Sequence, residues 1–118
     1  MPASREDYLL RMIQQLGEVL RRLRERLTGK VDAGDAVEIE REAAAAITTL
    51  LGPQAPLLFQ LDPTSAVRLV GDAERVGLWT SLMRVQSDAQ RLSGRLDAAD
   101  RLTARASALE QAARAAWP

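Results

Sequence analysis

Large aliphatic side chains recur at alternating steps of four and three residues near the N-terminus of the chain. Residues at that spacing lie on one face of an α-helix, so the pattern predicts a long amphipathic helix. This stripe consists of Leu9, Ile13, Leu16, Leu20, Leu23 and Leu27. Two similar ladders follow: Leu78, Leu82, Val85, Ala89 and Leu92, and then Leu102, Ala106, Leu109, Ala113 and Ala116. In water such stripes have to be covered by other helices, which predicts an all-α fold.

Turn and capping residues predict where the first two helices begin and end. Ser4 is a favourable N-cap, and the first helix is expected to run to Thr28, before Gly29. Asp35 with Glu38 forms a second candidate capping box, which predicts a helix over residues 36–51. The acidic start of this second helix is expected to lie against the arginine-rich end of the first, across a short hairpin. That pairing would set register more than stability, because exposed ion pairs contribute little.

The second half of the chain divides at further proline and glycine residues. Residues 54–61 are apolar and are expected to form a short helical turn or a buried plug. A short helix is predicted over residues 63–70, capped by Asp62, and a long one after Asp72. The long helix begins either at that cap or just after Gly77, and it ends near Gly94. The last helix is expected to begin at Leu96 or Asp97 and to end at Ala116.

Together these segments predict a single helical domain over residues 1–118. Four main helices and one or two short ones would form a bundle, and short loops would make neighbouring helices antiparallel. Glycine at a turn followed by small residues at helical spacing is typical of tetratricopeptide-like hairpins.

The chain contains neither cysteine nor histidine. A thiolate zinc site and a thiol nucleophile are therefore excluded, and the commonest metal ligand and general base are missing. We expect no catalytic residue, no metal site and no cofactor, and thus a non-enzymatic protein. The 16 basic and 16 acidic residues balance, which argues against nucleic acid as the main partner.

No membrane span or signal peptide is expected. The longest uncharged stretch, residues 43–61, is interrupted by Gly52, Pro53 and Pro56. Charged residues precede the first apolar run at the N-terminus, which is unlike a signal peptide. The lack of cysteine also favours the cytoplasm as the location.

The opening of the sequence resembles a family of small bacterial helical proteins that is catalogued only as a domain of unknown function. The matching residues are Asp7, Tyr8, Leu9, Arg11, Ile13 and Leu16, and later Leu50, Leu51, Gly52, Asp62, Gly94, Ala98 and Ala99. The resemblance implies a compact tetratricopeptide-like fold. It implies no activity and no functional residue.

The first helix carries more apolar residues than one covered face requires, which favours a protein-interaction surface. Binding would bury this face against another protein or a second copy of the chain, and a symmetric homodimer is the simplest arrangement. Tryptophan is common at interaction hot spots, so Trp117 is a further candidate, and Trp79 is either an anchor or ordinary core. The candidate interface residues are Tyr8, Leu9, Met12, Ile13, Leu16, Val19, Leu20, Leu23 and Trp117.

Two features of the first helix remain open. Its last turns carry a cluster of Arg21, Arg22, Arg24 and Arg26, which is a weak candidate site for an anion or a nucleic acid. Gly17 lies within the helix, where glycine costs about 1 kcal/mol relative to alanine. Either the helix bends there or another helix crosses closely, and we expect that crossing to lie within the chain rather than between subunits.

Overall fold

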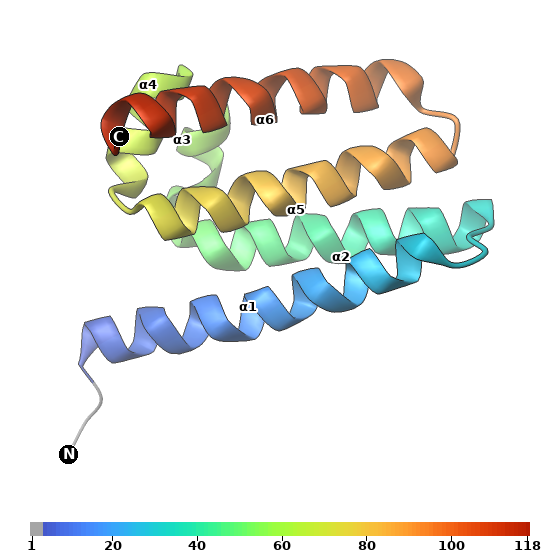
Figure 1. Cartoon of the computed structure of the whole chain (residues 1–118), viewed down its shortest axis with the longest axis horizontal. Helices are drawn as coiled ribbons and strands as arrows, with labels where there is room; N and C mark the ends of the chain where they lie inside the picture. Colours follow the sequence, from blue (N-terminus) through green and yellow to red (C-terminus); the bar gives the residue numbers. More distant parts are fainter. Residues whose placement is uncertain (1–3) are drawn as a thin grey trace.

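The computed structural model of the chain describes residues 4–118, and in that range it contains helices and no strand (Figure 1). The predicted all-α fold is thereby confirmed. The elements are α1 (Arg5–Thr28), α2 (Ala33–Leu51), the 3₁₀ helix η1 (Gly52–Gln54), α3 (Ala55–Gln60), α4 (Pro63–Val70), α5 (Ala73–Leu92) and α6 (Leu96–Ala116).

The start of α1 agrees with the sequence, whereas the start of α2 corrects it. The hydroxyl of Ser4 accepts a hydrogen bond from the backbone N–H of Asp7 at 3.1 Å. In α2 the N-cap is Asp32, whose carboxylate accepts from the backbone N–H of Asp35 at 2.8 Å. The carboxylate of Asp35 accepts in return from the N–H of Asp32 at 3.5 Å. The predicted pair of Asp35 and Glu38 was therefore wrong, and α2 begins at Ala33.

The middle of the chain breaks at the predicted proline and glycine residues. The short helical turn expected within residues 54–61 is α3, whereas the alternative of a buried plug was wrong, because Leu57 and Phe59 are about half exposed. Asp62 caps α4 by accepting from the N–H of Ser65 at 3.0 Å, and hydrogen bonds from Ser65 lower the pKa of that carboxyl. Asp72 caps α5 by accepting from the N–H of Glu74 at 2.8 Å. The helix continues through Gly77, so the alternative start after this glycine was wrong.

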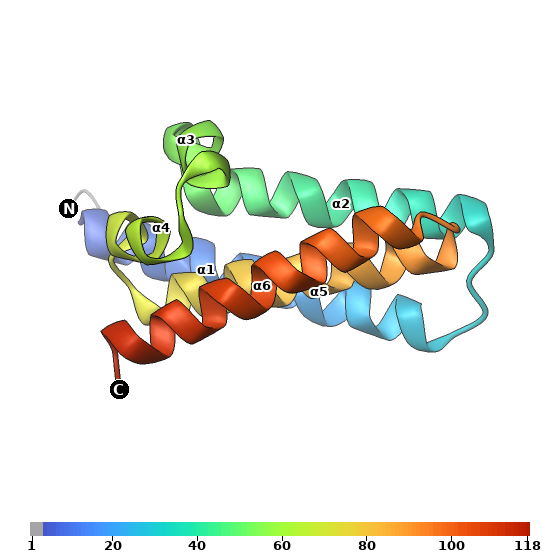
Figure 2. The same ribbon diagram turned by 90° about the horizontal axis from the view of Figure 1, so that it is seen from above.

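Helix α5 is the centre of the bundle. It packs against α2 on one side and α6 on the other, while α1 lies against α2 and α5. Figure 2 shows α6, α5 and α1 in one layer, with α2 and α3 displaced to one side of it. The largest fully buried side chains come from these helices and include Trp79, Ile39, Leu50, Leu58, Leu82 and Leu109. Trp79 is therefore part of the core.

In the described range, no helix combines the length and the apolar character that crossing a membrane requires.

Candidate interaction surfaces

The apolar face of α1 that the sequence analysis singled out is partly buried within the chain and partly open to solvent. Leu16, Leu20 and Leu23 are buried by the other helices of the same chain, so their predicted availability to a partner has to be corrected. Leu9, Met12, Ile13 and Val19 are half-buried, and the last three of these pack against the core. Tyr8 is 63% exposed. The surface open to a partner is thus narrower than the whole stripe and lies along one edge of α1.

A groove lies between α1 and α2, and of the partly open residues of α1 named above only Val19 lines it. It encloses about 480 Å³. Ala45 and Thr49 of α2 are exposed beside it and are small, so the groove stays open between the two helices. The lining consists of Leu16, Val19, Arg22, Leu23 and Arg26 from α1 and Glu42, Ala45, Ala46 and Thr49 from α2. We call this surface the α1–α2 groove.

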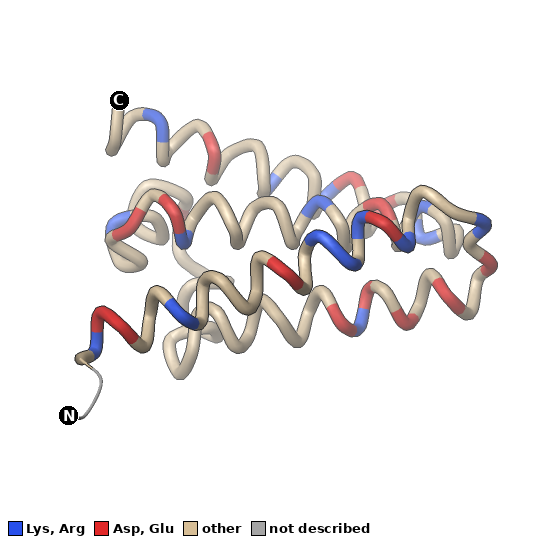
Figure 3. Tube along the Cα trace, turned by 60° about the horizontal axis from the view of Figure 1, so that its bottom comes forward, with Lys and Arg blue, Asp and Glu red and all other residues tan. Residues whose placement is uncertain are grey.

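Ion pairs close one end of the α1–α2 groove. Arg26 contacts Glu42 at 2.5 Å and Glu38 at 3.6 Å, which confirms the expected pairing across the hairpin for these residues. Figure 3 shows mostly basic residues on the C-terminal half of α1 and mostly acidic residues on the facing half of α2. Glu18 and Glu25 interrupt the first group, and Arg41 interrupts the second. Among the residues that line the groove, α1 contributes the cations Arg22 and Arg26, and α2 contributes the carboxylate of Glu42.

The arginine cluster is partly neutralised by its neighbours. Arg21 contacts Glu18 at 2.7 Å and Glu25 at 3.0 Å, and the hydrogen bond to Arg21 lowers the pKa of Glu18. Within residues 4–118, Arg22 and Arg24 have no ion-pair partner. An anion approaching this cluster would meet two unpaired guanidinium groups among several carboxylates.

The structure also locates Trp117 and Gly17, the two other residues that the sequence analysis singled out. Trp117 is half-buried and packs against the core, and its backbone N–H donates to the carbonyl of Ala113 at 2.8 Å. At Gly17 an added Cβ would meet no atom of residues 4–118 within 4 Å, so no other helix in that range crosses closely there. The expected crossing within the chain was wrong.

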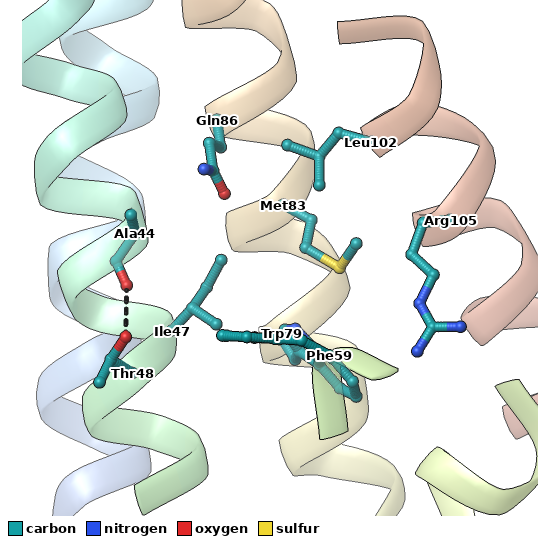
Figure 4. Close-up of a pocket in the computed structure, with 9 residues that line it drawn as sticks. All are labelled: Ala44, Ile47, Thr48, Phe59, Trp79, Met83, Gln86, Leu102 and Arg105. Carbon is teal, nitrogen blue, oxygen red and sulfur yellow. Dashed lines mark hydrogen bonds between the residues drawn. The ribbon is translucent and has the colours of Figure 1, made fainter. Parts of the chain in front are cut away.

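A second groove was not foreseen from the sequence. It has a volume of about 330 Å³ and lies over α5, between α2 and α6, with α3 at one end (Figure 4). Its lining comprises Ala44, Ile47 and Thr48 from α2, Phe59 from α3, Trp79, Met83 and Gln86 from α5, and Leu102 and Arg105 from α6. We call it the α5 groove. Phe59 lies close to α6 because α3 folds back over the bundle. No local sequence pattern predicts this arrangement of α3.

Arg105 is held at the edge of the α5 groove by backbone acceptors. Its Nη2 donates to the carbonyl oxygens of Leu58 and Leu61, at 3.1 and 2.6 Å. Burial lowers the pKa of Arg105, and the charge of Asp62 opposes this shift without forming an ion pair. The guanidinium still stays protonated at neutral pH.

No group of three or more potential metal-ligating side chains gathers in the part of the chain that the structure describes. Comparison with known protein families, with curated proteins and with solved structures finds no match to this chain. The resemblance of its opening residues to a family of helical proteins therefore stays a prediction. The function has to be argued from the two grooves and from the charges around them.

Proposed function

We propose that the protein is a non-enzymatic interaction module whose α1–α2 groove binds a second copy of the chain. The carrying observation is that the apolar face of α1 extends beyond the area that its own fold covers. Val19 lines the groove and is only half-buried, beside the exposed Ala45. Tyr8, which lies outside the groove near the start of α1, is 63% exposed. Covering such side chains stabilises an assembly by roughly 25 cal/mol for each Å² removed from water.

The charges around the groove favour a second copy as the occupant. The pairs of Arg26 with Glu38 and Glu42 show that the basic part of α1 and the acidic part of α2 lie at the same level of the hairpin. A two-fold axis parallel to these helices would set α1 of each copy against α2 of the other. Arg22, which has no ion-pair partner in the described range, would then face the acidic rim of the second copy. A groove with one basic and one acidic rim is complementary to itself under this rotation.

The test is sedimentation equilibrium of the whole chain over a wide concentration range, compared with the variant Ala45→Arg. Ala45 is exposed in the single chain, so the substitution leaves the core untouched while placing a charge in the groove. Ala104→Arg, on an exposed position of α6, is the matched control. We expect a dimer for the wild type and for Ala104→Arg, and a monomer for Ala45→Arg with an unchanged helical circular dichroism spectrum.

A monomeric wild type at high concentration would overturn self-association. If a different protein then bound to the wild type and to Ala104→Arg but not to Ala45→Arg, the α1–α2 groove would bind a heterologous partner instead of a second copy. For either occupant we propose a cytoplasmic protein with tetratricopeptide-like hairpins, as the sequence suggests.

Anion binding is the second candidate function, and the unpaired Arg22 and Arg24 are the observation that favours it. Retention on heparin that falls steeply as salt rises would support it, because released counterions give binding such a salt dependence. We expect Arg22→Gln with Arg24→Gln to abolish that retention. No retention at low salt would exclude this function.

A further inference from the structure

The α5 groove has the size and the lining of a small-molecule site. Its volume of about 330 Å³ falls within the 300–1,000 Å³ that is usual for ligand pockets. Trp79 and Met83 form an apolar floor on α5, and Ile47 and Leu102 flank it from α2 and α6 (Figure 4). An apolar body placed here would be removed from water on several sides.

The only charged residue that lines this groove in the described range is a cation. The lining contains Arg105 and the neutral amide of Gln86, and no aspartate or glutamate. Backbone carbonyls accept from Nη2 of Arg105, whereas Nε and Nη1 have no hydrogen-bond partner within residues 4–118. A planar guanidinium with free donors is suited to a carboxylate. No acidic side chain of the lining takes that place, and Asp62, whose charge reaches Arg105 from outside the lining, forms no ion pair with it.

We propose that the α5 groove binds a small amphiphile made of an apolar body and one carboxylate, which pairs with Arg105. Gln86 offers a second polar contact to the bound molecule. Phe59 is 53% exposed at the rim, and a bound apolar chain would cover part of this ring. This site is independent of self-association, because its lining shares no residue with the α1–α2 groove.

The tryptophan at the floor of the groove provides a direct assay. In the variant Trp117→Phe, Trp79 is the single tryptophan of the chain. The probe is 12-bromododecanoate below its micellar concentration, since bromine quenches tryptophan fluorescence at close contact. The matched probe is 12-bromododecanol, which has the same chain and no charge. We expect saturable quenching by the acid and about tenfold weaker binding of the alcohol, as for loss of a charge-assisted hydrogen bond.

Variants of the groove separate binding from folding. Arg105→Gln should bind the acid about tenfold more weakly and bring it level with the alcohol. Because Arg105 also holds α3, Ala44→Phe is a second test that fills the groove from α2 and leaves the guanidinium in place. It should abolish quenching, whereas Ala104→Phe on α6 should not. Equal quenching by acid and alcohol, or quenching that survives Ala44→Phe, would overturn the proposal.

Discussion

Arg95, at the turn before α6, donates from Nη1 to both carboxylate oxygens of Glu40 in α2, at 3.0 and 2.8 Å. Gln90 of α5 donates from Nε2 to the same carboxylate at 3.0 Å. The Glu40 side chain is only 14% exposed, so solvent screens this ion pair less than those on the surface. One carboxylate thus joins α2 to the turn between α5 and α6.

Glu40→Ala should therefore lower the free energy of unfolding by about 1–3 kcal/mol, because it leaves donors of Gln90 and Arg95 without their acceptor. Chemical denaturation at low protein concentration measures the change. The control is Glu38→Ala on the same helix, which removes a carboxylate that is 63% exposed and 3.6 Å from Arg26. Its expected effect is about 0–1 kcal/mol. Equal effects of the two variants would show that the Glu40 junction adds no particular stability.

The pair of Arg84 and Glu110 predicts a pH dependence. Arg84 donates to the two carboxylate oxygens at 3.1 and 2.5 Å, and this hydrogen bonding lowers the pKa of Glu110, while burial opposes it. A carboxyl with a lowered pKa in the folded state stabilises the fold above its ordinary pKa of about 4.3, and this contribution is lost as the pH falls further.

Glu110→Gln should accordingly be less stable than the wild type by about 0.5–1 kcal/mol at pH 7, since both side chains of the pair are partly exposed. The difference should shrink as the pH falls below about 4.3. Urea denaturation of both proteins between neutral and acid pH measures it. A difference that stays constant over the whole range would assign the effect to packing rather than to charge.

Two glycines of the chain should respond to alanine in opposite directions. Gly77 lies inside α5, and an added Cβ would meet no atom within 4 Å, so Gly77→Ala should stabilise the protein by about 0.5–1 kcal/mol. Gly94 has a φ of 84° at the turn between α5 and α6, and Gly94→Ala should destabilise it by about 1–2 kcal/mol. Thermal unfolding of both variants gives the comparison. A lower melting temperature for Gly77→Ala would mean that α5 is not continuous there.

The variant Gly17→Ala tests whether a second copy of the chain packs against the side of α1 that carries this glycine. In the part of the single chain that the structure describes, no atom lies within 4 Å of the added methyl group, so the monomer should gain stability as at Gly77. Reduced self-association of this variant would place a second copy of the chain against that side of α1 instead of against the α1–α2 groove.

The sequence predicted those parts of the fold that depend on local chemistry. Asp62 before Pro63 predicted the start of α4, since a carboxylate cap and a proline at the first helical position act within one turn. The same local rule was misleading at α2. Asp32 and Asp35 both suit an N-cap, and the reciprocal hydrogen bonds that make Asp32 the cap are apparent only in the structure.

The candidate sites depend on packing over long sequence distances, and the sequence predicted them only in part. The stripe through Leu16 and Leu23 identified the face of α1 that the core of the same chain covers, but the same spacing suits a core and an interface equally well. Arg105 belongs to a site because Phe59, on a short helix far away in the sequence, reaches the same groove. The spacing of apolar residues along the sequence cannot predict that two such distant residues line the same groove.

The most direct test of the central claim, self-association through the α1–α2 groove, measures a distance between two copies. The chain has no cysteine, so Gln15→Cys gives a single attachment point for a nitroxide label. Gln15 is exposed on α1, one helical turn before Val19, and lies outside the lining of the groove, so the label does not fill it. Pulsed electron spin resonance should then detect a distance of about 20 Å or less, because packed helices lie about 8–10 Å apart. The control Ala104→Cys on α6 should give a clearly longer distance. No coupling at Gln15→Cys, or a shorter distance at Ala104→Cys, would contradict the account.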